Sequence, residues 1–293
     1  MQKITPFLWL DKNLKEITDF YISAFPGSTV SSDGSLSDTP SGNVEMATLT
    51  IHGKQISLMT AGPQFKLNPS ISMFVTFETE AEIEAAWNIL IDGGMAMMPY
   101  DTYPWAKKYG WLQDKYGLTW QLSWSDNHDM AQRITPMMMF TQHVAGKTKE
   151  AIDFYTSIFP NSKTDLLVPY VEGDGDTPGL IKHSRFTLNN ENFLAMDSSA
   201  DHKFTFNEAF SFVVNCDNQE EIDFYWDKLS AVPEAEACGW LKDKYGVSWQ
   251  IVPSDMSTMM SCGDPEKIGR VTAAFMQMKK FDLATLRKAF DGE

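Results

Sequence analysis

The sequence predicts an α+β protein built from two homologous halves, each of which uses a strand–helix–strand–strand–strand unit twice. Residues 110–121 read GWLQDKYGLTWQ and residues 239–250 read GWLKDKYGVSWQ, with nine of the twelve positions identical. Two further segments recur in the same order, ITP at 4–6 and 134–136 and DFYxSxFP at 19–26 and 153–160. A repeat of about 130 residues is too long for a solenoid unit and matches the size of a small domain.

The first half alternates strand and helix signals. Strands are indicated where apolar and polar residues alternate, and helices where apolar residues recur every three or four positions. Pro26 ends the first helix, and Thr79 with Glu82 forms a capping box that begins the second. The expected elements, in chain order, are strand Pro6–Leu10, helix Leu14–Ala24, strands Val44–Ile51 and Gln55–Thr60, strand Ile71–Phe77, a helix over Ile83–Leu90 and short strands up to Trp124.

The second half repeats this order and carries an extension. We place the domains at residues 1–126 and 133–255, joined by the polar linker Asn127–Gln132. The extension, residues 264–293, has no counterpart in the first half, contains two helix signals, and is expected to dock on the body. The expected elements are strand Met137–Phe140, helix Ala151–Ile158, strands Ile181–Leu188, Phe193–Met196 and Phe210–Val214, helix Gln219–Leu229, strand Ser248–Val252, and helices from Pro265 and over Leu283–Phe290.

Composition narrows the classes of partner. The chain has 293 residues, 43% of them hydrophobic, and a formal net charge of −15. Such an acidic field repels phosphate backbones and anionic membranes, so nucleic-acid and membrane partners are not expected. No apolar run has the length of a signal peptide or a membrane span. Cys216, Cys238 and Cys262 are widely spaced and odd in number, which favours the reducing cytoplasm over disulfides or a cysteine zinc site.

Taken together, ITPFLWLD, DFYxSxFP and GWLxDKYGxxWQ resemble the PhnB-like branch of the vicinal oxygen chelate superfamily, which also contains glyoxalase I, extradiol dioxygenases and fosfomycin-resistance proteins. Members of this branch are often labelled 3-demethylubiquinone-9 3-methyltransferase. The resemblance covers nearly the whole chain. It implies tandem glyoxalase-like domains, with four βαβββ modules paired into two half-barrels whose concave faces hold the ligand. It also implies either a monomer with an internal pseudo-dimer or a homodimer.

The resemblance places metal ligands at positions that this chain fills with other residues. Metal-dependent members use a histidine near the start of the first strand, a histidine or glutamate near the start of the second module, and a glutamate four residues after the last turn glycine. Here Gln121 and Gln250 follow Gly117 and Gly246 at that spacing, and the corresponding strand starts lack histidine. A neutral amide is a poor ligand for a divalent cation. We therefore predict no metal, no cofactor and no metal-dependent glyoxalase or dioxygenase chemistry.

The methyltransferase label has no support in the residues. S-adenosylmethionine enzymes of the common class carry a glycine-rich loop between a strand and a helix, and the chain has no G-x-G-x-x-G pattern. Its glycine-dense stretches are Gly93-Gly94 at a helix end and Gly173-Asp174-Gly175 in an acidic loop. Methyltransferase activity is therefore not expected. We expect the acidic loop, residues 172–179, to lie solvated and mobile over the cleft of the second half.

Strand parity selects a candidate site in the second half. His183 and Arg185 alternate with apolar residues and point toward the expected concave side. The matching strand of the first half places Met46 and Thr48 there, so the second cleft is the more polar. Gln250 alternates with Trp249 and Ile251, and the family resemblance implies that it faces the same cleft as His183 and Arg185. There Arg185 is expected to hold a carboxylate or phenolate ligand. The alternative is that the two basic residues lie on an ordinary solvated sheet face.

The repeated GWLxDKYG motif has two interpretations. Its tryptophans, Trp240 and Trp249 in the second half, are candidates for the walls of a ligand pocket together with Gln121 and Gln250. Asp-x-Tyr-Gly is also a good tight turn between two strands, with glycine at positive φ. Because both halves carry the motif although their clefts differ, we favour the structural interpretation.

Two functions from different classes remain open. We favour a metal-free protein that binds a small anionic or phenolic molecule in the second cleft, with the first half mainly a packing partner. The alternative is an enzyme of the lyase, isomerase or transferase type acting on a small oxygenated or aromatic substrate. In that case His183 or His143 is the base and Arg185 stabilises charge.

Overall fold

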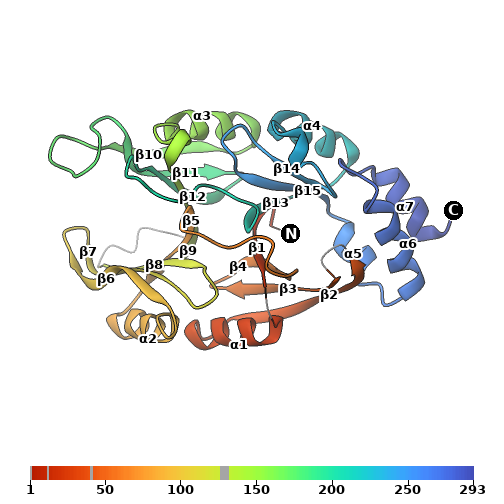
Figure 1. Ribbon diagram of the computed structural model, residues 1–293, viewed down its shortest axis with the longest axis horizontal. Helices are drawn as coiled ribbons and strands as arrows, with labels where there is room; N and C mark the ends of the chain where they lie inside the picture. The colour runs from red at the N-terminus through yellow and green to blue at the C-terminus, as the bar shows by residue number, and fades with distance from the viewer. Residues whose placement is uncertain (1, 12, 40–41, 126–131) are drawn as a thin grey trace.

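Two β-sheets, called sheet A and sheet B below, form the body of the protein (Figure 1). The computed structural model describes residues 2–11, 13–39, 42–125 and 132–293. Sheet A has seven strands, in the spatial order β14 (Trp240–Lys242), β15 (Ser248–Pro253), β13 (Phe210–Cys216), β1 (Ile4–Leu10), β4 (Lys54–Thr60), β3 (Gly42–Ile51) and β2 (Thr29–Thr39). Sheet B has eight, in the order β10 (Lys163–Pro169), β11 (Ile181–Leu188), β12 (Glu191–Asp197), β9 (Ile134–Phe140), β5 (Ile71–Phe77), β8 (Thr119–Trp124), β7 (Ala106–Gln113) and β6 (Met95–Tyr103).

Helices cover two opposite sides of the sheets and one end. α1 and α2 run along one side and α3 and α4 along the other, while α5, α6 and α7 gather beside β2 (Figure 1). No helix in the described ranges is long and apolar enough to cross a membrane. The helices are α1 (Leu14–Ala24), α2 (Glu80–Leu90), α3 (Thr148–Ile158), α4 (Gln219–Leu229), α5 (Met256–Met260), α6 (Pro265–Phe275) and α7 (Leu283–Asp291), with the short 3₁₀ turns η1 (Gln142–Val144) and η2 (Pro233–Ala235).

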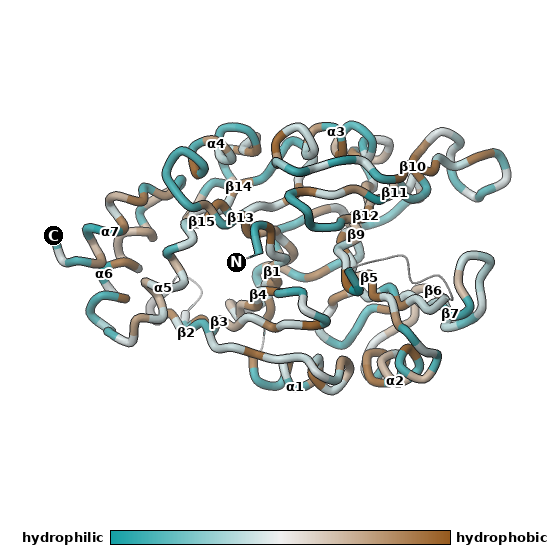
Figure 2. The backbone as a smooth tube through the Cα atoms, turned by 180° about the vertical axis from the view of Figure 1, so that it is seen from behind, coloured by the Kyte–Doolittle hydropathy of each residue, from teal (hydrophilic) through white to brown (hydrophobic). Residues whose placement is uncertain are grey.

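Capping and amphipathicity explain where these helices form. The side chains of Asn13, Thr79 and Asn218 each accept a hydrogen bond from a backbone N–H in the first turn of α1, α2 and α4. In α1 the buried residues fall on one stripe, which faces the sheets. Strand β9 is buried at every position, as a central strand with both faces covered must be. Hydrophobic stretches accordingly follow the strands and the inner sides of the helices (Figure 2).

Each sheet combines strands from both halves of the chain. β1 pairs antiparallel with β13 in sheet A, and β5 pairs antiparallel with β9 in sheet B. The first module therefore joins the fourth in sheet A, and the second joins the third in sheet B. The two modules of one half lie in different sheets. A cleft on either sheet is consequently shared between the two halves. The two modules of one half contribute to different clefts.

The predicted α+β fold of tandem modules is confirmed, with several additions. The edge strands β2, β10 and β14 and the short helix α5 were not among the elements expected from the sequence. β2 is rich in Ser, Asp and Gly and β10 is largely exposed, so neither has the apolar alternation that indicates a strand. The fourth module has two strands after its helix instead of three. The predicted linker Asn127–Gln132 falls, except for Gln132, outside the described residues.

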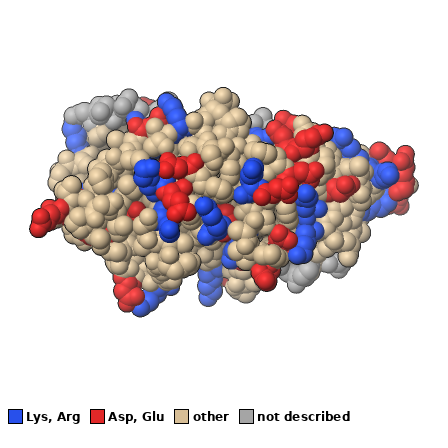
Figure 3. Space-filling view, turned by 90° about the horizontal axis from the view of Figure 1, so that it is seen from above, with Lys and Arg blue, Asp and Glu red and all other residues tan. Residues whose placement is uncertain are grey.

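Charged side chains are interspersed on the face that carries α3 and α4 (Figure 3). Lysines and acidic residues form pairs there, such as Lys149 with Asp153 at 2.6 Å and Lys280 with Asp223 at 2.8 Å. This view contains no continuous basic surface of the kind that binds a phosphate backbone.

Candidate functional site

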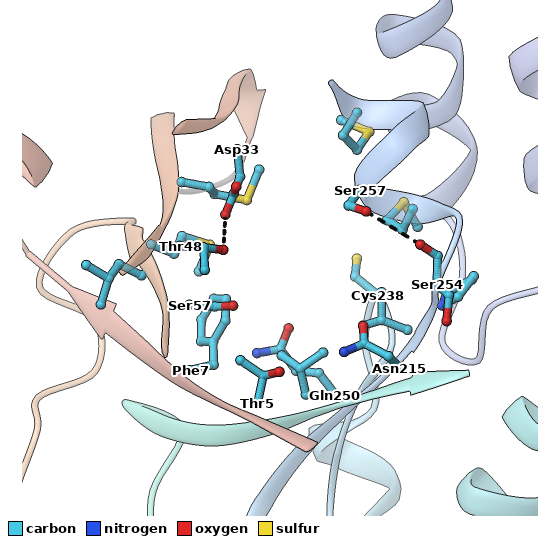
Figure 4. Close-up of a pocket in the computed structure, with 18 of the residues that line it drawn as sticks. Thr5, Phe7, Asp33, Thr48, Ser57, Asn215, Cys238, Gln250, Ser254 and Ser257 are labelled. Carbon is cyan, nitrogen blue, oxygen red and sulfur yellow. Dashed lines mark hydrogen bonds between the residues drawn. The ribbon is translucent and has the colours of Figure 1, made fainter. Parts of the chain in front are cut away.

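A cavity of about 680 Å³ opens on the concave face of sheet A. Its floor is formed by strands of the first and fourth modules, including Thr5 and Phe7 of β1 and Gln250 of β15 (Figure 4). Asp33 and Thr48, from β2 and β3, stand on one wall (Figure 4). A volume of this size suits a small organic molecule, since ligand pockets in proteins measure roughly 300–1,000 Å³.

Apolar and aromatic side chains supply much of the lining. The Phe7 and Trp240 rings meet edge to face with centroids 5.5 Å apart, and Phe275 and Phe281 of the C-terminal extension also line the cavity. Four methionines also line the space, Met46 and Met59 from adjacent strands and Met256 and Met260 from α5. Unbranched, polarisable methionine side chains adapt to ligands of different shape. The cavity therefore offers an apolar, deformable wall around a polar floor.

Two amide side chains on the cavity floor, Asn215 and Gln250, are held by hydrogen bonds from their nitrogens. The Asn215 Nδ2 donates to the backbone carbonyl of Gln2 at 2.8 Å, and the Gln250 Nε2 donates to the Ser211 hydroxyl at 3.0 Å. Each amide nitrogen thus uses one of its two N–H groups within the protein. The Asn215 Oδ1 and Gln250 Oε1 are left as hydrogen-bond acceptors for a ligand.

The C-terminal extension closes the cavity where the fourth module lacks a strand. The backbone N–H groups of Cys238 and Gly239 donate to the carbonyls of Met278 and Lys279, each at 2.8 Å. The side chain of Gln219 on α4 anchors the same segment by hydrogen bonds to the Phe281 carbonyl and the Leu283 N–H. The extension docks on the body, as expected, and it also contributes walls to the cavity.

The family follows from comparison with known proteins. A family model described as 3-demethylubiquinone-9 3-methyltransferase matches residues 2–123 and again residues 132–252. The chain belongs to the 3-demethylubiquinone-9 3-methyltransferase family. Each half of the chain is therefore one copy of that family's domain.

Two solved structures illustrate the relationship of this family member to its superfamily. A PhnB protein from Bacillus cereus is 35% identical, and the match covers 42% of this chain and 100% of that one, with a TM-score of 0.39. Glyoxalase I from Zea mays is 11% identical over 89% of this chain and 98% of that one, with a TM-score of 0.57, which shows a common fold. The fold is that of the vicinal oxygen chelate superfamily. The comparison with curated proteins found no match.

The structure separates the site residues that the sequence analysis grouped in this family member. Gln250 and Trp240 line the sheet A cavity, whereas His183, Arg185 and Gln121 lie on strands of sheet B. The expectation that Gln250 shares a cleft with His183 and Arg185 is wrong. The physical reason is the pairing of β1 with β13 and β5 with β9, which sends the two modules of each half to different sheets.

The concave face of sheet B is filled by a tyrosine where sheet A has its cavity. The Tyr109 hydroxyl donates to the Gln121 Oε1 at 2.8 Å, and the Gln121 Nε2 donates to the Ser72 hydroxyl at 2.8 Å. Tyr109 precedes Gly110 as Cys238 precedes Gly239, so the tyrosine ring of sheet B is a cysteine in sheet A. The smaller side chain leaves space in front of Gln250. The exchange of Tyr109 for Cys238 is visible when the sequences of the two halves are aligned, and it is the signal that could have pointed to the sheet A cavity.

Trp249 cannot wall a ligand pocket, because it is 1% exposed in the core. Its ring packs against Phe212 and Phe159, and its Nε1–H donates to the buried carboxylate of Asp243 at 2.9 Å. Asp243 also accepts hydrogen bonds from the backbone of the following turn. The structural interpretation of the GWLxDKYG motif is confirmed for its Asp and second Trp, and Trp240 alone of the two tryptophans faces the cavity.

The acidic loop before β11 is held to its neighbours. Lys182 pairs with Asp174 at 2.9 Å, and Asp176 accepts hydrogen bonds from the backbone and hydroxyl of Ser199. Burial and the adjacent Arg185 lower the pKa of His183, so this histidine is neutral near pH 7. His143, the other candidate base, lies exposed on η1 and does not line the cavity.

The donor set does not fit a resident divalent metal. Among the described residues that line the cavity, Asp33 and Cys238 are the ionisable ones. Burial raises the pKa of the Cys238 thiol, which keeps it protonated and a weak ligand. Across the described ranges no three His, Cys, Asp or Glu side chains gather as a metal site would require. Gln250, on the cavity floor, is a neutral amide and a poor ligand for a divalent cation.

Proposed function

We propose that this chain is a small-molecule-binding protein that works without a metal ion and holds its ligand in the sheet A cavity. The observation that carries the proposal is the cavity itself, with apolar walls, a lid made by the extension, and the acceptor oxygens of Asn215 and Gln250 on its floor. Apolar walls with a few convergent polar groups are the usual form of a ligand site.

Catalysis is the less favoured function, because the cavity has few groups that move protons. An enzyme of the lyase, isomerase or transferase type needs an acid or base at its substrate. His183 lies on sheet B and His143 is exposed on η1, so neither supports that role in the cavity. The methyl transfer in the family's name also lacks support, since no glycine of the described part of the chain lines the cavity to cradle a nucleotide.

The ligand site is tested by native mass spectrometry of the full chain against a metabolite library, followed by titration of the tightest ligand. Trp240→Ala is expected to weaken that ligand about tenfold or more, because it removes an aromatic wall. Trp111→Ala is the matched control, since Trp111 occupies the same motif position on sheet B. Prior dialysis against a chelator should leave binding unchanged.

The opposite result would place the ligand site on sheet B. If Trp111→Ala or Arg185→Ala weakens the ligand and Trp240→Ala does not, then the ligand binds on sheet B, as the sequence analysis expected. Loss of binding after chelator treatment, with recovery on adding a divalent metal, would refute a metal-independent site.

A further inference from the structure

The two concave faces differ in charge at matching positions. Thr48 pairs across the strands with Ser57, and Ser57 pairs with Phe7 of β1. In sheet B, Arg185 pairs with Leu194, and Leu194 pairs with Met137 of β9. Phe7 and Met137 follow the same ITP segment, so Thr48 is the counterpart of Arg185. Where sheet B has a guanidinium, sheet A has a threonine hydroxyl.

That threonine supports a carboxylate. The Thr48 Oγ1 donates to the Asp33 Oδ2 at 2.6 Å, and Asp33 stands on the cavity wall at a break in the pairing of β2 with β3 (Figure 4). No Lys, Arg or His in the described ranges forms an ion pair with Asp33, and none lines the cavity. The carboxylate is half-buried and lacks a cationic partner among the residues that the structure describes.

Other groups of the cavity also favour a positively charged ligand. The amide nitrogens of Asn215 and Gln250 each donate one hydrogen bond within the protein, and their oxygens are acceptors for a cationic group. The Phe7 and Trp240 rings, which meet edge to face, present electron-rich faces that attract cations. The thiol of Cys238 is neutral because burial raises its pKa. The net charge of −15 adds a long-range field that draws cations toward the protein.

We propose that the sheet A cavity binds an organic cation, a primary amine or amidinium with an apolar body, and that Asp33 is its counter-ion. This inference rests on the proposed function and names its ligand class. The ammonium donates to the Asp33 carboxylate and to the acceptor oxygens, while the apolar body contacts the aromatic and methionine walls. An anionic ligand is repelled by Asp33 and finds no basic side chain among the described residues that line this cavity.

The test uses three probes of one shape and different charge. Titration calorimetry on the full chain at pH 7 and low salt compares 1-naphthylmethylamine, which is cationic, with neutral 1-naphthalenemethanol and anionic 1-naphthoate. We expect the amine to bind at least tenfold more tightly than the alcohol and the carboxylate to bind weakest. Raising the salt concentration should weaken the amine and leave the alcohol unchanged.

Asp33→Asn tests the contribution of the carboxylate charge alone, because it leaves the rest of the cavity unchanged. This variant should lower the affinity for the amine to that of the alcohol and leave the alcohol unaffected. The matched control is Asp165→Asn, which removes the same charge from a carboxylate that also accepts a threonine hydrogen bond, from Thr187 at 2.9 Å, but on sheet B. Circular dichroism checks that both variants keep the native fold.

Two outcomes overturn different claims. If the alcohol or the carboxylate binds the wild type as tightly as the amine, or Asp33→Asn binds the amine as tightly as wild type, the ligand class is wrong and the binding site stands. If none of the three probes binds at millimolar concentration, or binding is insensitive to Trp240→Ala, the proposed binding function of the cavity itself fails.

Discussion

Asp114 and Asp243 are buried carboxylates that each accept hydrogen bonds from four donors. Asp114 accepts from the Tyr21 hydroxyl at 3.0 Å, from the Trp120 indole at 2.8 Å and from the backbone N–H groups of Tyr116 and Leu118. Asp243 repeats the arrangement with Tyr155 and Trp249. The two repeated motifs, DFYxSxFP and GWLxDKYG, therefore meet in space, and their recurrence has a structural cause.

The titration of Asp114 makes stability depend on pH. Burial raises its pKa to about 6, although the donated hydrogen bonds lower it, against 3.8 for an ordinary aspartate. Because the folded pKa lies above the unfolded one, the contribution to stability is complete below about pH 4. It is lost as the pH rises through about 6, and a shift of about two units corresponds to roughly 3 kcal/mol.

Asp114→Asn is expected to remove this dependence. The unfolding free energy of the wild type minus that of the variant should fall by roughly 3 kcal/mol from pH 4 to pH 7.5, because only the wild type loses stability as Asp114 ionises. Denaturant titration measures both values. Asp165→Asn, which removes a carboxylate paired with Lys163 on the edge strand β10, is the control and should show little change over this pH range. A constant difference between wild type and Asp114→Asn across that range would contradict the assignment.

The C-terminal extension takes over the work of a missing strand. In the second module the hairpin of β6 and β7 follows β8 at the edge of sheet B, and the fourth module has only β14 beside β15. Residues 276–281 run past Cys238 and Gly239 instead, and Met259, Met260, Val271, Phe281 and Leu286 form a small core of their own beneath α6 and α7. The extension is thus an integral wall of the cavity.

Gly239 is the position where this wall approaches most closely. Its φ is +84°, and a Cβ there would lie 2.6 Å from the Phe281 ring and 3.1 Å from the Ile251 carbonyl. Gly246 has a nearly equal φ of +85° with no heavy atom within 4 Å of such a Cβ. The two glycines thus share the backbone cost of an L-residue and differ in the contact with the extension.

Gly239→Ala is therefore expected to destabilise the protein by about 1–2 kcal/mol more than Gly246→Ala, by denaturant titration. Limited proteolysis should also cut Gly239→Ala faster within residues 255–293, since the displaced Phe281 loosens the extension. Equal stability and equal cleavage of the two variants would show that the extension is not held against this glycine.

At the scale of the whole molecule, the halves are joined by backbone pairing rather than by side chains alone. β1 with β13 and β5 with β9 make each sheet continuous across the two halves. Within each half, the hydrogen bond of Tyr21 to Asp114, or of Tyr155 to Asp243, ties modules that lie in different sheets. A half on its own would expose two unpaired strand edges, which associate readily with other strands.

We accordingly propose that the full chain is a monomer containing an internal pseudo-dimer. Size-exclusion chromatography with light scattering should give a mass near 33.1 kDa at micromolar concentration. The isolated first half, residues 1–125, should instead form a dimer or aggregate, because it lacks the partners of β1 and β5. A stable monomeric half, or a full chain at twice the expected mass, would contradict this proposal.

Periodicity and repeats sufficed for the elements whose apolar residues determine them. The central strands and the four long helices of the modules could be predicted, because burial of one face leaves a regular pattern in the sequence. The edge strands β2 and β10 could not, since exposed edges tolerate Ser, Asp and Gly. The family resemblance and the absence of acidic residues at Gln121 and Gln250 were likewise readable from the residues alone.

The site depended on information that no local pattern holds. Strand parity correctly turned Met46, Thr48 and Gln250 toward a concave face, but parity cannot say which strands share that face. The pairing of β1 with β13 decided that Gln250 faces Asp33 and Thr48 across one cavity, and separated it from Arg185. The sequence alone determined the modules and the inward side of each strand. The tertiary structure alone decided their partners, because hydrogen bonding between strands distant in the chain depends on the global packing of all four modules.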